Sequence, residues 1–124
     1  MSKFIERQKK IYKSLKFCFC PALQKTVHFT SDGLNHLLYY RRRPRNHQER
    51  HYRAALISNI VEVIEHAMQA INVIRSDDPL IVTWSLTHHI RGQGMVKVIL
   101  KQEGAGTVKF LSAMANKKTK KPRA

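Results

Sequence analysis

Apolar positions recur at helical spacing through the first half of the chain. Residues 3–16 set a few apolar side chains among lysines and arginines, which predicts a short basic helix. Thr30 and Ser31 are good N-cap residues for a second short helix. That helix must end near the arginines before Pro44, because proline disfavours helical backbone at the preceding residue. Residues 52–71 carry the longest apolar stripe and predict a third helical segment.

Two short features modify this helical pattern. Asn59, with Glu62 three residues later, resembles a capping box, so the third segment is expected to divide there into two helices. The apolar run Val27-His28-Phe29 fits either a strand or an extended lead-in to the second helix.

The last third of the chain changes to strict alternation of apolar and polar positions. Residues 80–87, 96–101 and 108–111 alternate in this way, and glycine-containing turns at 92–94 and 104–106 separate them. Three strands joined by tight turns predict an antiparallel meander with one apolar face. Because the preceding helices are what is available to cover that face, the predicted fold is α+β, with N-terminal helices packed on a C-terminal antiparallel sheet.

The net charge of the chain indicates what kind of partner it binds. The 124 residues include 23 Lys and Arg against 8 Asp and Glu, a formal net charge of +15. These positive charges repel one another, and binding to a polyanion relieves the repulsion. Nucleic acid is the favoured partner, since each neutralised phosphate releases condensed counterions. The alternatives are a solvated basic surface or a positive face that docks on an acidic protein.

Membrane and metal features are sparse in the sequence. No apolar run approaches the roughly 20 residues of a membrane span, and the first residues do not resemble a signal peptide, so the cytoplasm is the expected compartment. Cys18 and Cys20 lie too close in sequence for a comfortable bridge. With His28 and His36 they would make an unusual zinc ligand set. No metal and no other cofactor is therefore expected.

The acidic residues are few and scattered, which disfavours a magnesium-dependent nuclease. Cleavage of RNA without a metal needs a proton acceptor, a proton donor and cations around the phosphate. His36, flanked by Tyr39, Tyr40 and Arg43, is the candidate for proton transfer. The alternative for His36 is a histidine at the rim of the core.

Two clusters of side chains are candidates for binding RNA. The outward positions of the predicted sheet combine hydroxyls and an imidazole with cations, although an ordinary solvated face has the same composition. These positions are Thr83, Ser85, Thr87, His89, Lys97, Lys101 and Lys109. The second cluster is an arginine run that follows two aromatic residues, as in binders of single strands, and it also fits a localisation-like signal or a charged loop. It consists of Tyr39, Tyr40, Arg41, Arg42, Arg43 and Arg45.

The order of motifs resembles a known family. Residues 27–38 read VHFTSDGLNHLL, and an arginine-rich loop, a helix and the strands MVKVI and VKFLS follow. This order is similar to the phage-associated branch of the barnase, EndoU, colicin and RelE superfamily of nucleases, over residues 26–116. The resemblance implies helices packed against a four-stranded antiparallel sheet and cleavage of RNA without a metal. The fourth strand then has to come from residues 17–29 or from the tail.

Carried onto this sequence, the resemblance implies a catalytic set of one histidine, helix arginines, a strand lysine and a hydroxyl. These residues are His36, Arg50, Arg53, Lys97 and Ser112. The resemblance also divides the chain into a basic helical extension (1–25), a nuclease-like domain (26–116) and a basic tail (117–124). Because many relatives are toxins, an acidic antitoxin or immunity protein is an expected partner besides RNA.

Three functions are consistent with these features. The preferred one is an endoribonuclease toxin that cleaves through the 2′-hydroxyl and leaves 2′,3′-cyclic phosphate ends. The second is a non-catalytic RNA- or ribosome-binding module on the same basic surface. The third is an interaction domain that docks on an acidic protein.

Overall fold

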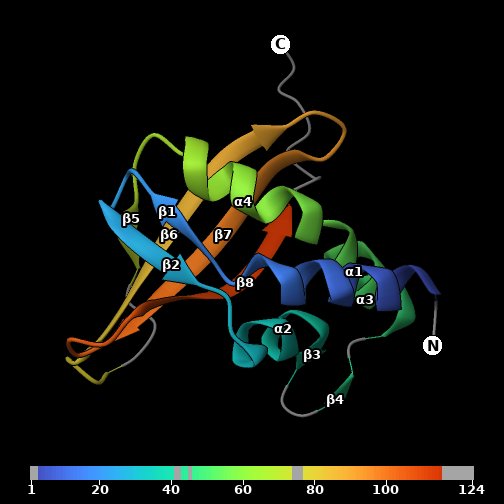
Figure 1. Cartoon of the computed structure of the whole chain (residues 1–124), viewed down its shortest axis with the longest axis horizontal. Coiled ribbons are helices and arrows are strands. Elements are labelled where there is room, and N and C mark those ends of the chain that lie inside the picture. Colours follow the sequence, from blue (N-terminus) through green and yellow to red (C-terminus); the bar gives the residue numbers. More distant parts are fainter. Residues whose placement is uncertain (1–2, 41–42, 45, 74–76, 116–124) are drawn as a thin grey trace.

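The computed structural model describes residues 3–40, 43–44, 46–73 and 77–115. Within them the elements follow one another in the order shown in Figure 1. They are α1 (Lys3–Leu15), β1 (Phe17–Cys20), β2 (Lys25–His28), α2 (Ser31–Leu38), β3 (Tyr39–Tyr40), β4 (Arg43–Pro44), α3 (His47–Ala55), α4 (Ile57–His66), β5 (Ile71–Val73), β6 (Ile81–Ile90), β7 (Gly94–Glu103) and β8 (Val108–Ala115). The predicted basic tail at 117–124 lies outside the described residues.

Side-chain caps fix the starts of two helices. The Thr30 side chain accepts a hydrogen bond from the Gly33 amide at the start of α2, as its sequence predicts. The Asn46 side chain accepts one from the Glu49 amide at the start of α3. The expected division of the third segment into two helices is present, but it lies at Leu56, which is fully buried, and not at Asn59. Asn59 lies inside α4 and caps no helix start.

The sheet is larger than the sequence pattern predicts. The predicted meander is present as β6, β7 and β8, but the sheet has six strands in the order β1-β2-β8-β7-β6-β5. The hairpin β1–β2, which precedes most of the helices, joins it through a parallel pairing of Val27 with Val108 and His28 with Lys109. The α+β class is confirmed, whereas the expected sheet of three to four antiparallel strands is wrong. Strands of four or three residues are too short to give a clear alternation.

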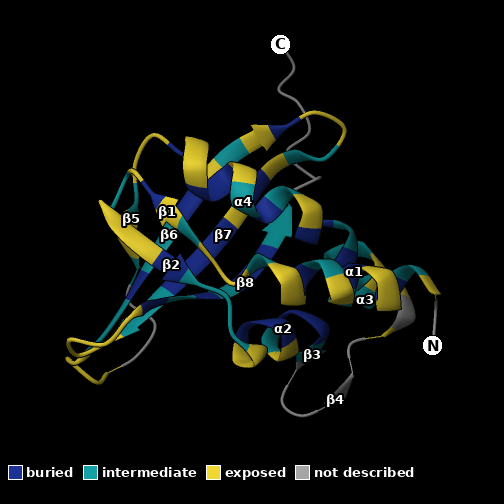
Figure 2. Cartoon of the chain, in the orientation of Figure 1, coloured by how far each residue is buried: buried dark blue, intermediate teal, exposed yellow. Residues whose placement is uncertain are grey.

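One face of the sheet, here called the inner face, packs on the helices. Its buried side chains include Leu86, Val98 and Phe110, and they share one apolar core with α1, α2, α3 and α4. Figure 1 shows α4 crossing in front of β6 and β7, and Figure 2 shows the buried residues of these strands behind it. The first helix belongs to this core too, since Ile5 and Tyr12 are buried in it. Among the described residues no helix is long and apolar enough to cross a membrane.

The residues that alternate with the inner face form the outer face of the sheet. Lys97 is exposed on this face, opposite Thr87 on β6. Lys101 lies opposite Thr83 on β6 and opposite Lys109 on β8. The strand register therefore confirms that the three lysines share a face with the hydroxyl side chains.

Candidate functional site

Helix α3 closes an edge of the sheet that no strand occupies in the described part of the chain. Strand β2 pairs with β8 at Val108 and Lys109 only, before the chain turns into α2. Further along β8, the Tyr52 hydroxyl donates to the Ala115 carbonyl and accepts from the Ala115 amide at 3.0 Å. Arg53 Nη1 donates to the Ala113 carbonyl at 3.1 Å. Side chains of α3 thus satisfy backbone groups that a neighbouring strand would otherwise pair.

A β-bulge in β8 decides which face Ser112 occupies. Leu100 pairs with Phe110 and Ile99 with Ser112, so Leu111 is an extra residue on β8. By simple alternation Ser112 would share the inner face with Phe110. The bulge reverses that alternation and brings Ser112 to the outer face, opposite Ile99.

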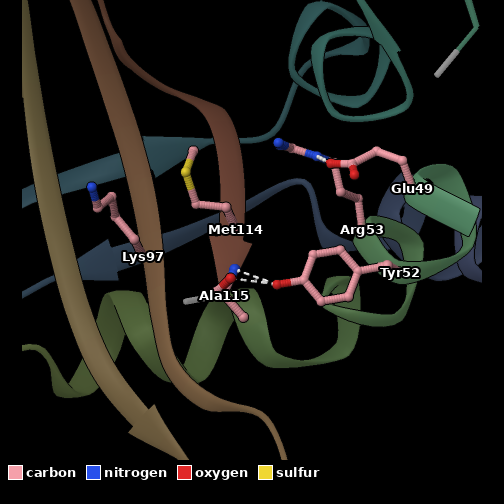
Figure 3. A pocket seen from close by; sticks show the side chains of 6 residues that line it. All are labelled: Glu49, Tyr52, Arg53, Lys97, Met114 and Ala115. Atoms are coloured by element: carbon pink, nitrogen blue, oxygen red, sulfur yellow. Dashed lines mark hydrogen bonds and ion pairs between the residues drawn. The ribbon is translucent and has the colours of Figure 1, made fainter. Parts of the chain in front are cut away.

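Helix α3 and strands β7 and β8 enclose a pocket of about 370 Å³ at this end of the outer face. Figure 3 shows Lys97 and Met114 on neighbouring strands at one side of the pocket, and Arg53 and Glu49 on the helix side, with Met114 between Lys97 and Arg53. The lining residues are Glu49, Tyr52, Arg53, Lys97, Met114 and Ala115.

Arg53 is the most heavily constrained side chain of the pocket. Its Nε lies 2.7 Å from Glu49 Oε2, and its Nη1 lies 3.4 Å from Ser112 Oγ. Only 13% of the Arg53 side chain is exposed, so the guanidinium is held in one orientation. Lys97 differs from it, because Lys97 is exposed and forms no ion pair within the described residues.

The pocket combines a carboxylate with two cations of different character. The guanidinium is fixed and partly neutralised by Glu49, whereas the Lys97 ammonium is free to meet a ligand. Two positive groups next to an open face suit a phosphate, and the carboxylate supplies a group that accepts a proton.

The structure brings together three of the five predicted catalytic residues. Arg53 and Lys97 line the pocket, and Ser112 contacts Arg53. His36 and Arg50 do not line it. His36 is half-buried on α2 with its Nδ1 inaccessible, and the Nε of Arg50 is buried on α3.

The predicted aromatic and arginine cluster is only partly described. Tyr39 is half-buried and packs against the core, so its ring is less available to a base than expected. Tyr40 and Arg43 pair in the short ribbon of β3 and β4. Arg41, Arg42 and Arg45 lie outside the described residues.

Four of the six lining residues, Glu49, Tyr52, Met114 and Ala115, are not among the site residues that the sequence predicts. Glu49 was passed over among scattered acidic residues, although it stands four residues before Arg53 on one helix, the spacing of an ion pair. The role of Tyr52 left no sequence signal, because its partner Ala115 is 63 residues away.

No family model, curated protein or solved structure matches this chain. Within the described residues, no group of three or more His, Cys, Asp or Glu side chains is arranged to hold a metal ion. A functional assignment therefore rests on the pocket and on the outer face.

Proposed function

We propose that this chain is an endoribonuclease of the toxin type, which cleaves RNA without a metal ion and leaves 2′,3′-cyclic phosphate ends. The observation that carries the proposal is that Glu49, Arg53 and Lys97 line one pocket beside the outer face. The formal net charge of +15 supports a polyanionic substrate.

The proposed reaction uses the groups of this pocket. The 2′-oxygen of the substrate attacks the adjacent phosphorus, and its proton passes to the carboxylate of Glu49. The bond from phosphorus to the 5′ oxygen breaks, and the leaving oxygen takes a proton from the ammonium of Lys97. Arg53 and Lys97 stabilise the negative charge that develops on the phosphate oxygens.

This assignment gives the proton-accepting role to Glu49 and not to His36. The Glu49 side chain is 38% exposed, so substrate reaches it, and it belongs to the same pocket as the cations. His36 is on a different helix and does not line the pocket. Ser112 is 1% exposed, and its role in the proposal is to position Arg53.

A cleavage assay in EDTA tests the proposal with three variants. Glu49→Gln should lower the rate by about 100- to 10,000-fold, the range lost with a general base. Lys97→Met should lower it as well, whereas His36→Ala should leave it within a few-fold. A substrate with a single 2′-deoxy residue at the cleavage site should stay intact, because it lacks the attacking oxygen.

Folding controls keep the assay interpretable. Glu49→Gln leaves the Asn46 cap intact, because that cap is made by the Glu49 backbone amide. Melting temperatures should therefore be compared before rates. The proposed ribonuclease activity would be refuted if a clean preparation of the unmodified chain left single-stranded RNA, tRNA and ribosomal RNA intact.

A non-catalytic RNA-binding module is the second candidate, and one observation favours it. Glu49 forms an ion pair with Arg53, and Tyr52 forms hydrogen bonds with the backbone of β8. These side chains therefore also stabilise the fold. A binding module predicts tight, salt-sensitive association without turnover and no effect of Glu49→Gln on RNA integrity.

A further inference from the structure

One residue from each strand forms a continuous row across the outer face. Each member is the direct cross-strand partner of the next, through five successive pairings. From the β1 edge to the β5 edge, the row reads Phe17, His28, Lys109, Lys101, Thr83 and Val73. An aromatic ring, an imidazole and two ammonium groups therefore stand side by side on adjacent strands.

Two phenylalanines at the β1 end of this row are exposed. Phe17 is 62% exposed and Phe19 is 48% exposed. They share the outer face because Cys18, between them, pairs with the buried Val27 on the inner face. Residues two apart on a strand lie about 7 Å from each other. The pair thus presents two rings next to each other at the edge of a basic surface.

His28 connects the rings to the lysines. Its ring centroid lies 5.9 Å from that of Phe17, with an angle of 48° between the planes. His28 is also the cross-strand partner of Lys109, which pairs with Lys101. Two strand spacings, about 10 Å, separate Phe17 from Lys109. A nucleotide spans a distance of this order from its phosphate to its base.

We propose that Phe17 and Phe19 form a stacking platform for unpaired bases of single-stranded RNA, with the phosphates of that strand on Lys109 and Lys101. The inference rests on the proposed function, since it assumes that RNA binds the outer face. Alternation of rings and cations is how proteins hold single strands, because every base offers a face that stacks on an aromatic ring. A duplex hides these faces, so the platform selects unpaired RNA.

The platform also deepens the proposed function. Lys97, in the pocket, lies on the same strand and the same face as Lys101, about 13 Å away. A strand anchored by its bases on β1 would cross β2 and β8 and reach β7 near the pocket. The platform therefore selects the substrate, and the pocket acts on it.

The test is a binding assay with a probe that the enzyme cannot cut. The probe is a 2′-O-methyl single strand with one 2-aminopurine, titrated in EDTA, and the matched probe is its duplex. The double variant Phe17→Leu/Phe19→Leu keeps apolar side chains and removes the aromatic faces. It should bind the single strand about 5- to 150-fold more weakly for each stacked base that is lost, and should lose the quenching of 2-aminopurine.

Three comparisons separate stacking from other effects. Phe17→Tyr/Phe19→Tyr should bind as the unmodified chain does, because tyrosine stacks. Leu80→Ala removes an apolar side chain that is 66% exposed and should change nothing. The slope of affinity against salt should be unchanged in the leucine variant, whereas Lys101→Ala/Lys109→Ala should reduce it by about 0.7 for each lost phosphate contact.

The outcomes distinguish this inference from the proposed function. If the unmodified chain binds neither probe and cleaves no RNA, the proposed function fails. If it binds or cleaves RNA and the leucine variant has the same affinity and quenching, the platform alone is refuted. In that case the exposed phenylalanines would be left as a docking surface for a protein.

Discussion

Replacing Gly33 by alanine should destabilise the protein, against the usual trend. In the interior of a helix, alanine is favoured over glycine by about 1 kcal/mol. A Cβ on Gly33, however, would lie 2.5 Å from the Phe110 carbonyl oxygen. It would also lie 2.7 Å from Phe110 Cδ2 and 2.7 Å from the Tyr12 hydroxyl. One of these neighbours is strand backbone, which cannot rotate away.

The magnitude follows from three contributions. Overpacking a dense site costs about 1–3 kcal/mol. Displacing the Tyr12 hydroxyl weakens its 2.6 Å hydrogen bond to the Thr30 carbonyl, which costs about 0.5–1.5 kcal/mol more. The higher helix propensity of alanine offsets about 1 kcal/mol of this loss of stability. The net effect should be a loss of about 0.5–3.5 kcal/mol in the free energy of unfolding, or roughly 2–14 °C in melting temperature.

Urea unfolding and thermal melting of Gly33→Ala measure this loss, and Asn35→Ala, at an exposed position of the same helix, is the control. Tyr12→Phe removes one of the three overlapping atoms, so the double variant should be less destabilised than the sum of the single ones. A Gly33→Ala protein as stable as the unmodified chain, or more stable, would refute the packing of α2 against β8.

Two further predictions concern the edge of β8 and the half-buried thiol of Cys18. Tyr52→Phe removes the hydroxyl that bonds both backbone groups of Ala115, so urea unfolding should show a loss of about 1–3 kcal/mol; an unchanged midpoint would contradict the edge closure. Burial, together with the charges of Glu65 and Cys20, raises the pKa of the Cys18 thiol from 9.0 to about 12. Its protonated form is therefore favoured in the folded state, and its contribution to stability is fully present below about pH 9 and decreases as pH rises toward 12. Unfolding curves across this window should show a steeper alkaline loss of stability than those of Cys18→Ser, and equal slopes would argue against desolvation of the Cys18 thiol.

The sequence pattern predicts those helices and strands whose periodicity or capping residue lies within the element itself. The period-two alternation gave β6, β7 and β8 with Lys97, Lys101 and Lys109 on one face, because the pleat of a strand fixes that alternation. The cap at Thr30 gave the start of α2, because the capping bond spans three residues. In these cases a residue and its partner are neighbours in sequence.

The candidate site depended on contacts between distant segments. The sequence by itself determined the basic charge, the α+β class and the face of the three lysines, since composition and periodicity carry them. Only the tertiary structure decided that α3 borders β8, that the bulge at Leu111 places Ser112 on the outer face, and that Phe17 shares a row with Lys109. The physical reason is that strand register and edge pairing are set by packing between segments as far apart along the chain as Val27 and Val108, which is beyond the reach of local periodicity.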